Sequence, residues 1–211
     1  MKTMQVITNI VALCTLPAAS WAGTTLLNEN FNELTPALTQ TSVGAFSAID
    51  GTNVDVVGGA LFGSLCVAPE IGNCVDLDGS GGKSQGILQS NAVFTLQPGV
   101  NYYLSFDLTG SQRGLTTSTT VNFGPYSETF VLASGNDTGG VVSDALLAVA
   151  APTTAQLTFT SNTPGDVGAL LDNVLVTSSS TASTSVPEPA TLGLLALGFA
   201  GVGFARRKRH S

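Results

Sequence analysis

The chain has 211 residues, which is enough for one domain with appended segments. Charged residues make up 10% of the sequence, well below the roughly 25% of an ordinary soluble domain, yet the 43% hydrophobic content excludes a disordered chain. From Glu29 to Asp172 there are thirteen acids against two bases, Lys83 and Arg113, a net charge of about −11. No nucleic-acid partner is expected, because phosphate binding needs clustered Lys and Arg. Such a charge suits solubility or the binding of hard cations such as Ca²⁺.

Residues 1–22 have the layout of a secretory signal peptide. Lys2 precedes an apolar stretch that ends at Pro17, and Ser20 and Ala22 occupy the −3 and −1 positions of a cleavage site. The pattern predicts export and cleavage after Ala22. A buried N-terminal helix and an uncleaved anchor are the alternatives.

Two cysteines, Cys66 and Cys74, remain once residues 1–22 are removed. In an oxidising compartment a close, even pair predicts a disulfide. The alternative is half of a metal site, but this would need further Cys or His nearby, and the sequence has none there.

The middle of the chain carries strand patterns. Residues 101–110 alternate, with Tyr102 and Phe106 on one face and Tyr103 and Asp107 on the other, which predicts a half-buried strand. Residues 91–96 and 155–161 show strand patterns too, and 119–124 and 127–133 predict two strands around a Gly124-Pro125 turn.

Two later segments complete the expected sheets. Residues 169–178 are apolar on both faces apart from Asp172 and Asn173, as in a central strand. Residues 139–152 fit either a short helix or a strand, and their valines favour a strand. We expect eight to ten strands between residues 23 and 177, in an all-β, jelly-roll-like antiparallel β-sandwich.

The C-terminal part changes character twice. Residues 178–186 are rich in Ser and Thr and predict a flexible linker. The uncharged run 190–205 would span about 24 Å as a helix, short of a ~30 Å hydrocarbon core, although flanking bases can snorkel. We expect a single transmembrane helix with its basic end in the cytoplasm, which places the domain outside the inner membrane. The alternative is a buried core helix.

Residues 187–211 resemble the PEP-CTERM sorting signal of Gram-negative bacteria. Three features carry the resemblance: the motif Pro187, Glu188, Pro189; the Gly-rich apolar run; and the basic tip Arg206, Arg207, Lys208, Arg209. The resemblance implies an exosortase partner, an integral membrane protease-transpeptidase that cuts near the motif. It also implies transient membrane anchoring and delivery to the cell surface or to an exopolysaccharide matrix.

The body resembles the choice-of-anchor domains of such exported proteins. The matching segments are 75–79, 99–110 and 171–174, whereas residues 84–90 and Ala169 depart from the pattern. A wider resemblance is to galactose-binding-like jelly rolls, many of which hold structural Ca²⁺ with an acid after a first-strand Phe and an Asp in the last strand. Asp172 matches the second position, but Asn32 stands at the first.

Three aspartates are candidate calcium ligands. Asp76 and Asp78 could converge on a hard cation, although an Asp-Gly turn explains them equally simply. For Asp172 the alternative to calcium is a structural contact with the neighbouring backbone.

Nothing marks a catalytic centre in the body. The only histidine, His210, lies in the tail, so a Ser-His-Asp triad is not expected, and no two of the thirteen acids are marked as a catalytic pair. Tyr103, Asp107 and Tyr126 are candidates for a ligand face, against routine surface aromatics. The sequence predicts a non-catalytic surface or matrix protein. The alternative is a carbohydrate-binding module of that matrix.

Overall fold

The computed structural model describes residues 23–66, 72–81, 85–134, 141–142 and 145–180. The chain divides into two compact units, Met1–Ser180 and Thr181–Ser211, and the second lies outside the described residues. The predicted signal peptide, the sorting signal and its membrane run at 190–205 also lie outside them. Within the described ranges, no helix has the length and hydrophobicity needed to cross a membrane.

The described residues form antiparallel sheets. The eight-stranded sheet contains β1 (Thr24–Glu29), β2 (Ala37–Gln40), β5 (Val54–Val57), β6 (Cys74–Asp76), β9 (Val100–Thr109), β12 (Val141–Val142), β13 (Ala145–Leu147) and β16 (Leu170–Ser180). The six-stranded sheet contains β3 (Ser42–Val43), β4 (Phe46–Ala48), β7 (Ile87–Ser90), β10 (Thr117–Phe123), β11 (Tyr126–Leu132) and β15 (Thr158–Ser161). A small third sheet pairs β8 (Phe94–Leu96) with β14 (Thr153–Ala155), and one 3₁₀ turn, η1, covers Gly63–Leu65.

The two large sheets pack face to face around one aromatic core, which confirms an all-β antiparallel sandwich. Phe106 of β9 meets Phe159 of β15 edge to face, with ring centroids 5.3 Å apart, and Phe46 of β4 lies 6.1 Å from Phe159. All three rings are buried. Edge-to-face pairs add about 0.5–1.5 kcal/mol each beyond the area that they bury.

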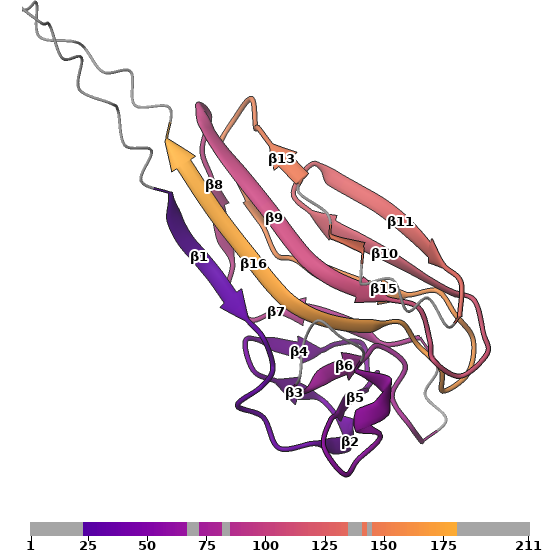
Figure 1. The fold of residues 1–211 in the computed structure, drawn as a ribbon. Coiled ribbons are helices and arrows are strands. Elements are labelled where there is room, and N and C mark those ends of the chain that lie inside the picture. Colours follow the sequence, from indigo (N-terminus) through magenta and orange to yellow (C-terminus); the bar gives the residue numbers. More distant parts are fainter. Residues whose placement is uncertain (1–22, 67–71, 82–84, 135–140, 143–144, 181–211) are drawn as a thin grey trace, which may run out of the picture. The chain divides into compact units, whose positions relative to one another are not determined.

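The alternating sequence patterns predicted the positions of the long strands correctly. β16 lies between β9 on one side and β6 and β1 on the other, which confirms a central strand (Figure 1). The segment at 139–152 forms β12 and β13 at the edge of β9, so the strand alternative is confirmed for the described part of it. β10 and β11 are joined by Gly124 and Pro125, and Gly124 has φ +58°, a conformation that glycine adopts without strain.

Two details differ from expectation. The described residues hold sixteen strands rather than eight to ten, because bulges and turns cut several segments into strands of two to four residues. β16 continues to Ser180, three residues into the stretch expected as linker. Its polar residues Ser178–Ser180 are held there by pairing with Tyr102–Val100 of β9, a contact that local composition does not reveal.

Candidate functional site

The outer face of the eight-stranded sheet, which points away from the aromatic core, carries four aspartates. Asp55 of β5 stands opposite Asp76 of β6, and Asp107 of β9 stands opposite Asp172 of β16. Directly opposed residues share a face. We call Asp55, Asp76, Asp107 and Asp172 the acidic face.

The apolar residues beside these aspartates along the strands show that the acidic face points away from the main core. Val54, Val56 and Val75 belong to the main core, whereas Val57, Cys74 and Leu170 form a second cluster with Leu65 on the other side of the sheet. The loop that contains η1 therefore covers part of the acidic face.

Asp76 is the most constrained of the four aspartates, with an exposed fraction of 1%. Its Oδ1 accepts hydrogen bonds from the backbone N–H groups of Asp78 (3.1 Å) and Gly168 (2.9 Å), and its Oδ2 forms an ion pair with Arg113. Position 168 has to be glycine, because a Cβ there would collide with the Asp76 carboxylate and with the backbone of Asp78.

Burial raises the pKa of Asp76 to about 7. The Arg113 guanidinium and the two backbone hydrogen bonds act in the opposite direction, and the neighbouring Asp55 carboxylate raises the pKa further. Asp76 therefore changes charge near neutral pH, in a place where almost no solvent reaches it.

Asp55 is a second buried acid, and it fastens two other segments. Its Oδ1 accepts from the backbone N–H groups of Thr39 (2.7 Å) and Ser80 (3.0 Å), and its Oδ2 accepts from the Ser80 hydroxyl (2.6 Å). These bonds connect β5 to β2 and to the loop after β6.

Asp78 does not join the acidic face. Its side chain is fully buried, and its Oδ1 accepts from the backbone N–H groups of Gln85 (3.1 Å) and Gly86 (3.2 Å). Burial raises the pKa of Asp78, while hydrogen bonding, led by the Ser161 hydroxyl, acts against it. The bond from Asp78 N–H to Asp76 Oδ1 is the Asx-type contact of a turn, which fits the turn alternative.

Asp172 and Asp107 are joined by a β-bulge. Asn173 is the extra residue, with φ +50°, a conformation that asparagine tolerates better than most residues. Its Nδ2 donates to Asp107 Oδ2 (2.8 Å), and its backbone N–H donates to Asp172 Oδ1 (2.7 Å). These contacts fit the structural alternative for Asp172.

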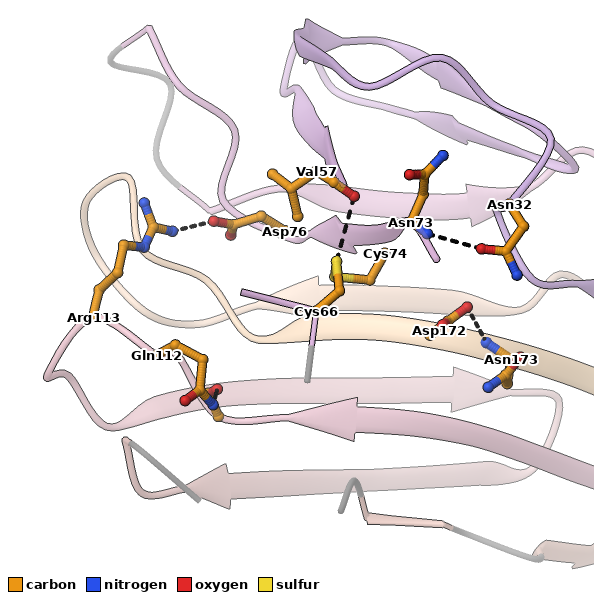
Figure 2. The surroundings of a disulfide bond; sticks show 11 residues. Asn32, Val57, Cys66, Asn73, Cys74, Asp76, Gln112, Arg113, Asp172 and Asn173 are labelled. Carbon is orange, nitrogen blue, oxygen red and sulfur yellow. Dashed lines mark hydrogen bonds and ion pairs between the residues drawn. A yellow bond between two sulfur atoms is a disulfide. The ribbon is translucent and has the colours of Figure 1, made fainter. Parts of the chain in front are cut away.

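The disulfide Cys66–Cys74 is present, as the spacing predicted. It ties the loop after β5 to β6 (Figure 2). Asn32 Oδ1 accepts from the backbone N–H of Asn73 (2.8 Å), and Asn73 Nδ2 donates to the backbone oxygen of Leu34 (2.7 Å). Asn32, the position after Phe31 where the galactose-binding-like pattern would have an acid, thus holds Asn73 next to Cys74.

The calcium hypothesis for Asp76, Asp78 and Asp172 stays a prediction. Asp76 and Asp172 lie on the acidic face, whereas Asp78 points elsewhere. No group of three or more His, Cys, Asp or Glu in the described part of the chain is arranged to hold a metal ion. A cation at Asp76 would also have to compete with Arg113 for Oδ2.

The candidate ligand face is divided between the two sheets. Tyr103 is 37% exposed on β9, on the same side of the strand as Asp107. Tyr126 begins β11 in the other sheet, where its hydroxyl donates to Glu128 (2.7 Å). Tyr103 and Asp107 therefore share a face, and Tyr126 is not part of it.

Two residues of this site, Asp55 and Arg113, were not predicted. The sequence could have pointed to Asp55, because an acid inside the apolar run 54–57 must have hydrogen-bond or charge partners when the run is buried. Arg113 had only the weaker signal of being one of two bases in the body.

Comparison with known proteins identifies the C-terminal segment. Residues 185–209 match the model described as "PEP-CTERM protein-sorting motif". No curated protein matches the chain.

Solved structures share low sequence identity with the chain. The K3 cleaved adhesin domain of Lys-gingipain from Porphyromonas gingivalis W83 is 15% identical, with a TM-score of 0.47, over 74% of this chain and 99% of that one. The CBM22-1 xylan-binding domain of Xyn10C from Paenibacillus barcinonensis is 17% identical, with a TM-score of 0.38, over 78% and 100%. The CBM22-1–GH10 modules of Xyn10B from Clostridium thermocellum, complexed with xylohexaose, are 13% identical, with a TM-score of 0.46, and the match covers 76% of this chain but 29% of that one.

The family match confirms the PEP-CTERM resemblance that the motif, the apolar run and the basic tip suggested. It covers the tail alone, so the choice-of-anchor resemblance of the body stays a prediction. The chain carries the sorting motif of an exported surface protein that an exosortase processes.

Proposed function

We propose that this protein is a non-catalytic component of the cell surface or extracellular matrix. In this proposal the signal peptide is cleaved after Ala22, the run 190–205 holds the precursor in the inner membrane, and an exosortase cuts near Pro187-Glu188-Pro189. The single observation that carries the proposal is the sorting-motif match at residues 185–209.

The fold is compatible with such processing. The aromatic core closes within residues 23–180, and its last strand, β16, ends at Ser180. A cut near Pro187 therefore removes no residue of the described sandwich, and the released body keeps its core and its disulfide.

Intact-mass analysis of the protein exported by its native host tests this proposal. We expect a mass that begins at Gly23 and ends near the Pro187–Pro189 motif. The matched variant Glu188→Ala, which leaves the apolar run and the basic tip unchanged, should accumulate as a longer, membrane-held form. An exported wild-type mass that ends at Ser211 would refute processing.

Carbohydrate binding is the second candidate function. The observation that favours this candidate is the outer surface of the six-stranded sheet, where the uncharged side chains of Gln89, Thr158 and Asn122 stand opposite one another. Sugar hydroxyls pair with such hydroxyl and amide groups.

A further inference from the structure

One row of side chains crosses the whole width of the six-stranded sheet. The strand register places its members directly opposite one another on successive strands. We call them the polar row; from β3 to β11 they are Ser42, Ser47, Gln89, Thr158, Asn122 and Ser127.

The polar row faces away from the core. The residues beside its members along the strands, Phe46, Leu88, Phe159 and Val121, are all buried in the core. Side chains alternate across a strand, so the row itself points outward, and its members are half-buried or exposed.

A second row runs beside the first and is partly held in place. Thr129, Thr120 and Thr160 oppose one another on β11, β10 and β15. The Thr120 and Thr129 hydroxyls lie 2.9 Å apart in a hydrogen bond, and Asn162 Nδ2 donates to Thr120 Oγ1 (2.8 Å). These contacts fix rotamers before any ligand arrives, which lowers the entropy lost on binding.

Neither row contains a charged residue, although the body is strongly acidic. The acid on β11, Glu128, alternates to the other side of the strand, where it accepts from the Tyr126 hydroxyl (2.7 Å). An anionic polymer would find no basic partner in these rows and would be repelled by the net charge of the body. A neutral polymer would lose no ion hydration on contact.

The chemistry of the surface argues against a protein partner. Cores of protein interfaces are rich in aromatic and apolar side chains. The large apolar residues around the two rows include Ile49 and Ile87, which are half-buried, and Val131, which is 68% exposed. Hydroxyl and amide groups, which both donate and accept hydrogen bonds, match the hydroxyls of a sugar chain instead.

We propose that the polar row and the threonine row beside it bind a neutral polysaccharide, laid across the strands of the six-stranded sheet. Six strands give the row a length of about 24 Å, enough for an extended stretch of several sugars. The inference rests on the proposed delivery to a polysaccharide matrix and names the class of polymer and the surface that binds it.

Native gel electrophoresis in gels that contain a soluble polysaccharide tests the inference, with the protein purified after export. The probes are barley β-glucan, dextran and xylan as neutral polymers and alginate as an anionic one. We expect at least one neutral polymer to retard the wild type and alginate not to. The double variant Gln89→Glu/Asn122→Asp, which changes charge with almost no change of shape, should bind about tenfold more weakly or worse.

Asn101→Asp is the matched control, because it makes the same isosteric change on β9 of the other sheet, two residues from Tyr103. We expect its retardation to equal that of the wild type. The inference is overturned if none of the neutral polymers retards the wild type, if alginate retards it equally, or if the double variant binds as tightly as the wild type. It is also overturned if sedimentation shows that the wild type is a dimer and the double variant a monomer, because the surface then joins two copies. Processing at the PEP motif is read from the intact mass and does not depend on any of these outcomes.

Discussion

The two sheets of the sandwich share a core but present opposite chemistry to their surroundings. The eight-stranded sheet carries the acidic face, partly covered by the loop that contains η1 and by Arg113. The six-stranded sheet carries the polar row and the threonine row, which have no formal charge. Both surfaces arise from the same alternation of strand residues, so the difference lies entirely in which polar residues occupy the outward positions.

The two outer surfaces differ in how far their side chains are engaged by the rest of the chain. On the acidic face each carboxylate is engaged by neighbours in the chain, such as the backbone N–H groups of Thr39 and Ser80 at Asp55. On the six-stranded sheet the outward side chains are more exposed and hold no buried charge. We infer that the acidic face fastens loops to the sheet and that the uncharged surface remains accessible to a partner.

The largest expected effect concerns pH and Asp76. Its pKa is 3.8 in the unfolded chain and about 7 in the folded protein, so between these values the unfolded chain releases a proton that the folded protein keeps. Stability from this residue is therefore greatest below about pH 4, falls by about 4 kcal/mol as the pH rises through about 7, and is flat well above that pH. Urea unfolding from pH 4 to pH 8 measures the fall.

Two variants sharpen this result. Asp76→Asn should flatten the decline with pH, because the titrating group is gone. Asn122→Asp adds a carboxylate to the outward-facing polar row, where we expect a much smaller change of the decline than in Asp76→Asn. The same slope in Asp76→Asn and wild type would show that other groups set the pH dependence.

The next effect concerns the disulfide. The Cys66–Cys74 bond closes a loop with a sequence separation of eight residues. In the chain-entropy model such a loop contributes about 2.5 kcal/mol, so Cys66→Ala/Cys74→Ala should lower the melting temperature by roughly 5–10 °C. The midpoint of a calorimetric scan measures this shift.

Chemical reduction of the wild type should produce a similar shift. Polysaccharide binding by the six-stranded sheet should survive in the double variant below its melting temperature. If the double variant is as fully folded as the wild type but no longer binds, the two outer surfaces are coupled.

The sequence predicted the sandwich and its long strands, because alternation along 101–110 and 119–133 leaves one register that buries Phe106 and Val121. It also predicted the disulfide, since the two cysteines are close and have no competing partner. It did not predict the pair of Asp76 with Arg113, which are 37 residues apart, because a loop residue shows no periodicity. The polar row was missed for a similar reason: it exists only once six separate strands are in register.

The ion pair between Asp76 and Arg113 leads to a prediction of a smaller effect. Arg113→Met should raise the pKa of Asp76 further, because the opposing positive charge is lost. Since the Arg113 side chain is 36% exposed and therefore screened, we expect a loss of about 1 kcal/mol at pH 8. Urea unfolding at pH 8 tests this, with Arg113→Lys as the control that keeps the charge. Equal stability of all three proteins would mean that the ion pair contributes nothing.

The smallest expected effect is that of calcium on the acidic face. Asp76 offers oxygens already engaged by two N–H groups and by Arg113, and Asp172 Oδ1 accepts from Asn173. A bound cation would have to displace these contacts, so 1 mM CaCl₂ or EDTA should each move the melting temperature by less than about 1 °C. A calcium-dependent rise of several degrees that disappears in Asp172→Asn would instead establish the calcium site, and the acidic face would then bind a ligand as well.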